Sequence, residues 1–286
     1  MTIDPELDKL YNVRAAIPDH MDIFADWERR AANFSKAVSG MLDLSYGAGE
    51  RAKLDLYLTE NRDAPLHVFI HGGYWQAMDK SQSSFLAKAF LDAGVNVTML
   101  GYDLCPTVTL RELTEEIRQA FVWLWQHAGK HGYDPRKIQI SGHSAGGHLV
   151  GMLLATDWSS YGLPADVNPI HSAIAISGLF DLTQLVPTSI NNKLGLDMDE
   201  AKSLSPLFVE PQNICPFLLV VGGDESSGFH QQSDNLKKVW GNRFEQLDRM
   251  NAVNCHHLSV VAQLAQKESA LFQWATRQLE SWRIVL

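Results

Sequence analysis

The chain has 286 residues, of which 45% are hydrophobic and 20% are charged, and its formal net charge is −9. This length and apolar content are enough to bury a sizeable core in one domain, residues 1–286. The negative charge, with no basic cluster, argues against nucleic acid and anionic membrane surfaces as partners. No uninterrupted apolar stretch approaches the roughly 18 residues of a membrane span.

Cysteine usage and the first residues narrow the class further. The three cysteines are sparse and form no CxxC pair, so they indicate neither a disulfide framework nor a structural zinc site. The opening MTIDPELDKLYNVR carries acidic residues and lacks the apolar core of a signal peptide. We therefore expect a cytoplasmic protein, and we leave open whether it forms a homodimer.

In chain order, short apolar runs alternate with longer amphipathic segments. Strands are predicted at Leu42–Tyr46, Lys53–Leu58, Leu66–Ile70, Val95–Gly101, Lys137–Ser141, Ala173–Ser177, Phe217–Gly222 and, with a weaker pattern, Arg243–Leu247. Helices are predicted at Asp19–Ser39, Lys80–Ala93, Leu110–Lys130, Gly146–Thr156, Gly228–Trp240 and Lys267–Trp282. Strands separated by helix-length segments indicate βα units and a mostly parallel sheet flanked by helices.

Two segments depart from this rhythm. Residues 1–40 carry a helical pattern before the first strand, and we expect them to form an N-terminal helical arm packed on the body. Between about residues 180 and 211, prolines and asparagines interrupt the strand rhythm, which is where a small cap region would be inserted over a site. The GAGER segment after Tyr46 favours an antiparallel hairpin between the first two strands.

The segment KIQISGHSAGGHL carries the strongest chemical signal. A predicted strand ends at Ser141, Gly142 to Gly146 fit the pattern GxSxG, and a helix-length segment follows. This strand–turn–helix context is that of a nucleophile elbow, in which Ser144 sits in a strained turn at a helix N-terminus. Gly142 and Gly146 would let the backbone fold tightly around the serine.

A serine nucleophile needs a base and an acid that orients the base. Downstream of the elbow, PFLLVVGGDESSGF reads as a strand that ends in two glycines and Asp224. We predict Asp224 as the acid because it comes first after the strand, at the sheet edge where open α/β sheets place their sites. Glu225 is the neighbouring alternative.

The base is expected later in the chain, in NAVNCHHLSVV. His256 and His257 are adjacent, so their side chains diverge and only one can serve as base. Spacing alone does not choose between them. His143 and His148 lie within or just after the elbow, where packing roles are expected.

The segment FIHGGYW fits the other half of the site. Acyl transfer needs backbone N–H donors aimed at the developing oxyanion, and one comes from the residue after the nucleophile, Ala145. A His-Gly-Gly loop after an earlier strand supplies the others, here Gly72 and Gly73, with the N–H of Tyr74 as a further candidate. His71 is expected to fix this loop by hydrogen bonding.

Taken together, the motifs resemble the kynurenine formamidase (arylformamidase) family of α/β-hydrolases over about residues 11–261. The similar segments are HGGYWQ, GYDLCP, GHSAGGHL, SGLFDLTQL, GGDESSGFHQQS and the HLSVV ending. The resemblance implies an α/β-hydrolase fold and hydrolysis of N-formylkynurenine to kynurenine and formate, with no metal or organic cofactor. It also implies Ser144 as nucleophile, Asp224 as acid and, through the match of His257-Leu258 to the family's His-Phe motif, His257 as base.

Two departures from the family pattern lie near the expected substrate site: Leu258 replaces the usual phenylalanine, and Ser227-Gly228 precedes Phe229 where the family often has proline and glutamate. Tyr74, Trp75 and Phe229 are predicted to wall a pocket for an aromatic amide or ester. The alternative functions are a carboxylesterase on small aryl or alkyl esters and a non-catalytic binding protein. The presence of serine, acid and late histidine disfavours the last.

Overall fold

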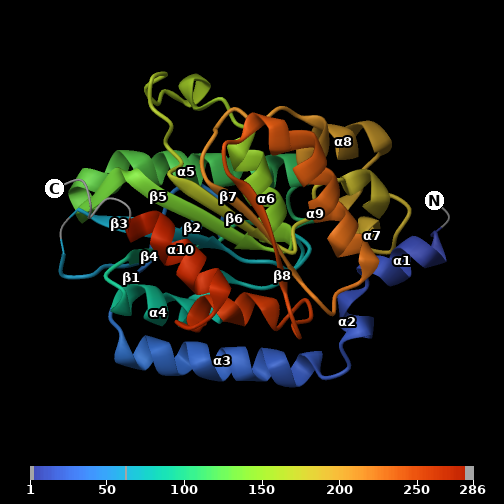
Figure 1. Ribbon diagram of the computed structural model, residues 1–286, viewed down its shortest axis with the longest axis horizontal. Helices are drawn as coiled ribbons and strands as arrows, with labels where there is room; N and C mark the ends of the chain where they lie inside the picture. Colours follow the sequence, from blue (N-terminus) through green and yellow to red (C-terminus); the bar gives the residue numbers. More distant parts are fainter. Residues whose placement is uncertain (1–2, 62, 281–286) are drawn as a thin grey trace.

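A single eight-stranded sheet organises the molecule, as the computed structural model shows for residues 3–61 and 63–280 (Figure 1). Its strands, in spatial order, are β1 (Met41–Ser45), β2 (Lys53–Tyr57), β4 (Asn96–Leu100), β3 (Ala64–Ile70), β5 (Tyr133–His143), β6 (Ser172–Ile176), β7 (Phe217–Gly222) and β8 (Leu247–Ala252). β2 is antiparallel to both of its neighbours, and all the other pairs are parallel. The predicted mostly parallel sheet and the β1–β2 hairpin are therefore confirmed.

Helices cover both faces of this sheet. The longer α-helices are α1 (Pro5–Tyr11), α3 (His20–Ala37), α5 (Leu110–His131), α6 (Ala145–Leu154), α9 (Ser227–Trp240) and α10 (Ala270–Glu280). The short α-helices are α2 (Val13–Ala16), α4 (Ala87–Asp92), α7 (Asn191–Leu194) and α8 (Met198–Ser203). The 3-10 turns are η1 (Lys80–Leu86), η2 (Trp158–Tyr161), η3 (Leu182–Leu185), η4 (Pro206–Phe208), η5 (Gly241–Arg243) and η6 (Val260–Ala265).

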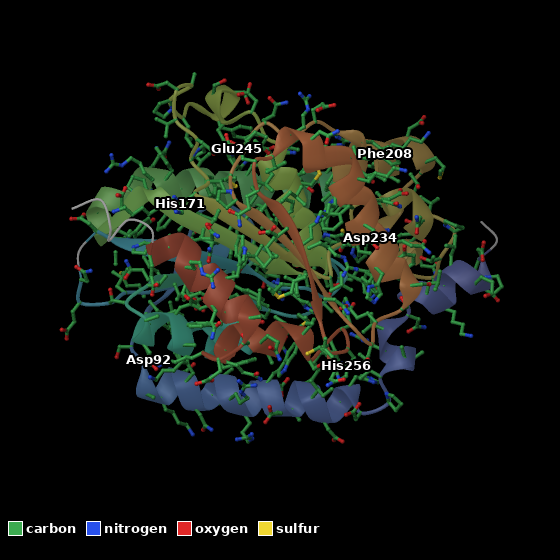
Figure 2. The ribbon with its side chains drawn as sticks, viewed as in Figure 1. Asp92, His171, Phe208, Asp234, Glu245 and His256 are labelled. Atoms are coloured by element: carbon green, nitrogen blue, oxygen red, sulfur yellow. The ribbon has the colours of Figure 1, made fainter. Side chains whose placement is uncertain are left out.

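The two helical layers are joined to the sheet by apolar contacts. α4 and α10 pack together on one face, where the rings of Phe90 and Phe272 lie 5.0 Å apart, and α5 and α6 contact each other on the other face (Figure 1). β3, β4 and β6 are buried along their whole length. Charged side chains such as Asp92, Asp234 and Glu245 lie on the outside of the molecule (Figure 2).

The parallel strands decide where a site can form. β3, β5, β6 and β7 are neighbours in the sheet and run in the same direction, so their carboxyl ends meet at one edge. The segments that follow these ends begin at His71, Ser144, Ser177 and Gly223. Open α/β sheets place their ligand sites at this edge.

The weakest strand prediction, Arg243–Leu247, is wrong in position. Arg243 ends η5, and the strand β8 runs from Leu247 to Ala252. The apolar signal came from Phe244, which is buried against the rings of Phe217 and Trp240 rather than in a strand. β8 itself pairs only with β7 at the sheet edge and is only partly buried, so it needs no apolar run.

The other predicted elements match with small shifts at their ends. The helix predicted at Lys80–Ala93 is divided into a 3-10 turn, η1, and the helix α4, and it begins with a capping box between Asp79 and Gln82. The helix predicted at Lys267–Trp282 begins at Ala270, and its last two residues lie outside the described residues.

Residues 3–37 form the expected helical arm along the body. α3 runs beside η1 and α4 (Figure 1). There Trp27 packs against Phe85, and the Arg30 guanidinium lies 4.0 Å from the centre of the Phe85 ring. α1 is anchored elsewhere, because Asp4 N–H donates to the carbonyl of Pro187 and Asp8 accepts from Ser189 N–H. The arm therefore spans from the α4 side of the sheet to the segment between β6 and β7.

Within residues 3–61 and 63–280, no helix is long and apolar enough to cross a membrane. The three cysteines are all buried and unpaired. Across the same residues, His, Cys, Asp and Glu side chains form no group of three or more that could hold a metal ion.

Four buried histidines make the fold sensitive to acid. Burial lowers the pKa of His67, His71 and His148 to about 4 and that of His143 to about 3. The unfolded chain, with histidine pKa near 6.5, therefore binds more protons than the folded one below that pH. These four groups therefore leave the free energy of unfolding unchanged above about pH 6.5, and they lower it as the pH drops from 6.5 toward 4.

The four groups act in the same direction, so their effects on the free energy of unfolding accumulate as the pH falls. We expect urea unfolding midpoints to fall between pH 7.5 and pH 5. A midpoint that stays level across this range would contradict the neutral, buried state of the four rings.

Candidate active site

Ser144 lies in a tight turn between β5 and α6, as the GxSxG pattern predicted. Its backbone has φ 55° and ψ −115°, outside the favoured regions for a residue with a side chain. A Cβ at Gly142 would lie 2.2 Å from the carbonyl oxygen of Gly146, and a Cβ at Gly146 would lie 2.1 Å from that of Ile70. Only glycine fits at both positions. The GxSxG pattern and the strained backbone of Ser144 therefore have the same cause, which is the close packing of this turn.

His257 lines the same cavity as Ser144 and is paired with a buried carboxylate. Both residues line the same cavity, and both are nearly buried. His257 Nδ1 lies 2.6 Å from Oε2 of Glu225, whose side chain is fully buried. Because a carboxylate can only accept, Nδ1 carries the proton and Nε2 is left as the free, basic nitrogen.

The prediction of Asp224 as the acid paired with the late histidine is wrong in position. Asp224 is exposed, and its backbone N–H donates to the carbonyl of Cys255. The chain turns back directly after β7, where Glu225 N–H donates to the carbonyl of Gly222, and this turn brings the longer side chain of Glu225 under the strand end. Distance along the sequence could not show this reversal, which makes the second acid the inward one.

Glu225 is held by more than the histidine. Its Oε1 accepts hydrogen bonds from the N–H of Gly222, at 2.7 Å, and from the hydroxyl of Ser177 at the end of β6. Burial acts to raise the pKa of this carboxyl, but the facing His257 and these two donors together lower it below its ordinary value. The carboxylate therefore stays ionised at neutral pH although it is buried.

The two adjacent histidines have different surroundings. His256 Nδ1 accepts from the backbone N–H groups of Leu258 and Ser259, which closes a turn before η6. His256 is not among the residues that line the cavity. The structure therefore brings His257, the residue chosen from the family motif, to Ser144 and leaves His256 in a turn.

His143 fixes the backbone of His257. Its Nε2 donates to the His257 carbonyl oxygen at 2.8 Å, and the two rings lie 4.7 Å apart. Because burial, followed by the neighbouring His257, lowers the pKa of His143 to about 3, this ring remains neutral. Phe229 lies against the other part of the His257 ring, with ring centres 4.3 Å apart.

The His-Gly-Gly loop packs directly against the serine turn. A Cβ on Gly72 would lie 3.2 Å from the Cβ of Ser144, and Gly73 has a φ of 105°. Ala145 is the first residue of α6, so its N–H has no acceptor within the helix. In the part of the chain that the structure describes, the N–H groups of Gly72, Gly73 and Ala145 donate to no protein acceptor.

Of the three predicted pocket aromatics, only Tyr74 lines the cavity. Its hydroxyl donates to the carbonyl of Tyr11 in the N-terminal arm. The predictions for Trp75 and Phe229 are wrong. Trp75 is completely buried in the core, edge-on to the ring of His148 at 5.0 Å. Phe229 is buried behind His257 and against Tyr11.

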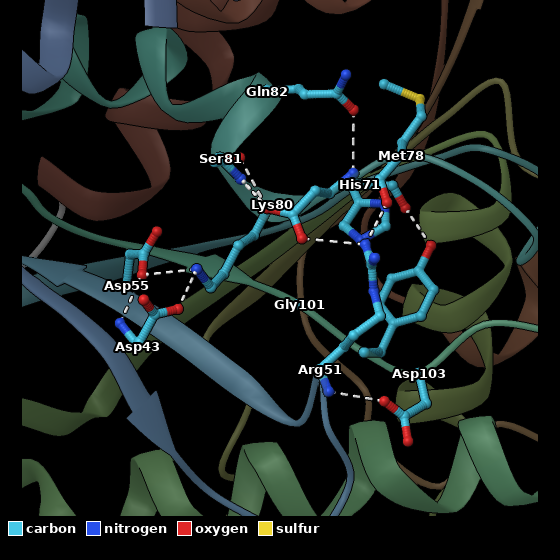
Figure 3. A network of polar contacts seen from close by, with 12 residues as sticks. Asp43, Arg51, Asp55, His71, Met78, Lys80, Ser81, Gln82, Gly101 and Asp103 are labelled. Carbon is cyan, nitrogen blue, oxygen red and sulfur yellow. Dashed lines mark hydrogen bonds and ion pairs between the residues drawn. The ribbon is translucent and has the colours of Figure 1, made fainter. Parts of the chain in front are cut away.

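A polar network that the sequence did not reveal holds the loop after Gly73 (Figure 3). The guanidinium of Arg51 donates to the carbonyl of Met78 and to the carboxylate of Asp79, and Arg51 N–H donates to Asp103 at 2.7 Å. Arg51 comes from the turn between β1 and β2, so the edge hairpin braces a loop at the sheet centre. In the sequence, the hairpin predicted at the GAGER segment was the only indication near this network.

A second part of this network anchors η1. Lys80 Nζ lies 2.9 Å from carboxylate oxygens of both Asp43 and Asp55 (Figure 3). Burial lowers the pKa of this ammonium, but the two carboxylates outweigh it and raise the pKa above its ordinary value. On the other side of the loop, the Tyr102 ring stacks on His71 at 4.2 Å, and its hydroxyl donates to the His71 carbonyl.

The cavity has a volume of about 550 Å³, within the usual range of small-molecule sites. Its inner end holds Ser144 and His257, and its walls come from the arm, the loop after Gly73 and the segment between β6 and β7. The remaining lining residues are Tyr11, Asn12, Val13, Arg14, Met21, Phe24, Glu28, Gly73, Tyr74, Gln76, Ala77, Met78, Gln82, His143, Ser189, Ile190, Lys193 and Leu258. The sequence gave no signal that residues 11–28 would form one wall.

Comparisons with known proteins identify the family of the chain. The BD-FAE family model matches residues 54–240. Kynurenine formamidase from Salmo salar is 30% identical over 266 residues, which cover 90% of this chain and 87% of that protein. The chain belongs to the kynurenine formamidase family.

Solved structures place this family member among α/β-hydrolases. A protein from Silicibacter sp. TM1040, provisionally described as a thioesterase, is 38% identical, with a TM-score of 0.84 over 95% of this chain and 99% of that one. Esterase B from Lactobacillus rhamnosis shares the fold at 21% identity, with a TM-score of 0.69 over 92% of this chain and 93% of that one. The chain is therefore a hydrolase of the α/β-hydrolase fold, acting on amide or ester bonds.

Proposed function

We propose that the protein is a serine hydrolase that cleaves an aryl formamide, with N-formylkynurenine as substrate and kynurenine and formate as products. The observation that carries the proposal is the arrangement of Ser144 and His257 on one cavity, with His257 Nδ1 held at 2.6 Å by buried Glu225. Ser144 is the nucleophile, His257 the base, and Glu225 replaces Asp224 as the orienting acid. No cofactor is part of this mechanism.

In the first step, Nε2 of His257 takes the proton of Ser144 as its hydroxyl attacks the formyl carbon. The tetrahedral oxyanion accepts hydrogen bonds from the N–H groups of Gly72, Gly73 and Ala145. Such donors act where charge develops, and loss of one typically costs about 10²–10³ in rate. The loop network around Arg51 fixes their positions before substrate arrives.

In the second step, His257 returns its proton to the aryl amine as the C–N bond breaks, which leaves a formyl ester on Ser144. Water, deprotonated by the same imidazole, then attacks this ester, and formate leaves as Ser144 recovers its proton. Glu225 stabilises the imidazolium in both halves of the reaction and does not itself take the proton.

The substrate assignment rests on the cavity and on the relatives. The volume of about 550 Å³ accommodates a substituted aromatic amide, and the aromatic residues Tyr74 and Phe24 line it. The relative from Salmo salar is named kynurenine formamidase. Leu258 lines the cavity where the family motif has phenylalanine, and this observation favours the alternative, a carboxylesterase on small aryl or alkyl esters.

A steady-state comparison tests the assignment. We expect kcat/KM on N-formylkynurenine to exceed that on p-nitrophenyl acetate by at least about tenfold, because pocket contacts to the larger substrate contribute only there. A kcat/KM on the formamide far below that on the ester would leave the serine hydrolase mechanism in place and make the protein a carboxylesterase.

A further inference from the structure

The charges around the cavity are separated from its reacting end. Ser144 and His257 are buried lining residues, whereas Arg14, Glu28 and Lys193 line the same cavity and are exposed. The exposed charges therefore lie toward solvent. They come from three elements outside the sheet: α2, α3 and α7.

Arg14 stands out because it has no anionic partner. Lys193 has none either, as is common for the lysines of residues 3–61 and 63–280, where only Lys80, Lys88, Lys137 and Lys267 form ion pairs. The chain carries 33 acidic and 24 basic residues, so carboxylates are available in excess. Most arginines are indeed paired with one: Arg29, Arg30, Arg51, Arg111, Arg118, Arg136, Arg243 and Arg249. Within residues 3–61 and 63–280, neither Arg14 nor Lys193 lies in an ion pair or hydrogen bond of its side chain.

The lining also contains apolar side chains. Val13, Phe24 and Met78 lie on the arm and loop sides, and Ile190 lies on the side of α7. A ligand that fills the cavity would therefore put its scissile bond at Ser144, its aromatic body against these side chains, and its far end beside Arg14 and Lys193. Glu28 is the only carboxylate of the described lining, so an ammonium group would find its partner there.

We propose that Arg14 and Lys193 are specificity-determining residues that bind a carboxylate on the leaving-group side of the substrate, at the solvent end of the cavity. With Glu28, they fit the amino-acid head of a substrate that carries both charges. The inference rests on the proposed function for the position of the scissile bond, and it names two residues that select anionic over neutral substrates. Neither residue touches the reacting atoms.

A matched pair of esters tests this inference without a formamide. One is an aryl acetate whose phenol carries a propanoate side chain, and the other carries a propanamide in its place. We expect the protein to prefer the carboxylate ester about tenfold in kcat/KM, since each charge-assisted hydrogen bond contributes modestly at an exposed site. In the double variant Arg14→Gln/Lys193→Gln this preference should vanish through a higher KM, with kcat and the amide ester unchanged.

The control variant is Lys9→Gln/Lys202→Gln. It removes the same net charge from α1 and α8, outside the cavity lining, so it reports the general effect of charge on an anionic substrate. Its preference for the carboxylate ester should match that of the parent protein. Equal kcat/KM on the two esters in the parent protein, or equal losses in both double variants, would overturn the inference.

The proposed function is separable from this result. If N-formylkynurenine is not hydrolysed but the carboxylate preference is present and lost in Arg14→Gln/Lys193→Gln, the two residues select an anionic ester. If N-formylkynurenine is hydrolysed but the esters are not distinguished, the formamidase assignment stands and the role of Arg14 and Lys193 is refuted.

Discussion

Ser144→Ala is expected to lower kcat/KM on every substrate, formamide or ester, by about a million-fold, the size of loss seen when a serine protease loses its nucleophile. The variant keeps the oxyanion donors and His257 but has no oxygen to form the acyl intermediate. The side chain is nearly buried and an alanine fits the same strained turn, so the thermal unfolding midpoint should change little. Rates with purified protein and a thermal melt are the two measurements.

Ser189→Ala is the matched control for this variant. Ser189 lines the same cavity, but its side chain is exposed and its backbone N–H, not its hydroxyl, is bonded to Asp8. Its rates should stay within a few-fold of the parent. If Ser144→Ala kept a near-full rate on any substrate, acyl transfer through this serine would be the wrong mechanism for that substrate.

Glu225→Gln is expected to lower kcat by about 10⁴-fold, whereas Asp224→Asn should change it by no more than a few-fold. An amide at position 225 can donate to Nδ1 of His257, which favours the tautomer with the proton on Nε2 and removes the base. Asp224 is exposed and bonds through its backbone, so its carboxylate contributes nothing to the imidazole. The comparison separates two adjacent acids with the same kind of substitution.

Folding must be checked in parallel, because Glu225 also binds Ser177 and Gly222 N–H. Circular dichroism and the melting midpoint show whether Glu225→Gln remains folded, and Ser177→Ala gives the effect of losing one partner of the carboxylate while the pair with His257 remains. A large loss in Asp224→Asn with a near-normal rate in folded Glu225→Gln would restore Asp224 as the acid.

The elements that carry the site follow from local patterns. The strand, the GxSxG turn and the helix around Ser144 depend on backbone geometry within a few neighbouring residues. The sequence therefore predicted the elbow as the structure has it. The same holds for the His-Gly-Gly loop, since Gly73 needs a positive φ and a Cβ there would lie 2.2 Å from the Ala77 carbonyl oxygen. The alternation of apolar runs and helical segments likewise predicted the parallel sheet.

Where the prediction failed, the deciding contacts come from distant segments. Position after β7 favoured Asp224 over Glu225, but a reverse turn against Cys255 brings Glu225 to His257 instead. Trp75 lies in the loop after the two glycines and Tyr74. It faces the core because it packs against His148 on α6. Between His256 and His257 the residues themselves gave no choice; the family resemblance did, and the structure agrees.

The sequence by itself determined the fold class, the strained serine and the glycine loop beside it, because each depends on hydrophobic periodicity or on backbone geometry within one short segment. Only the tertiary structure decided which acid meets His257, which aromatic rings face the ligand, and that the N-terminal arm forms a cavity wall bearing Arg14. These depend on how side chains from α2, α7 and the strand ends meet in space, and no pattern within a single segment records that.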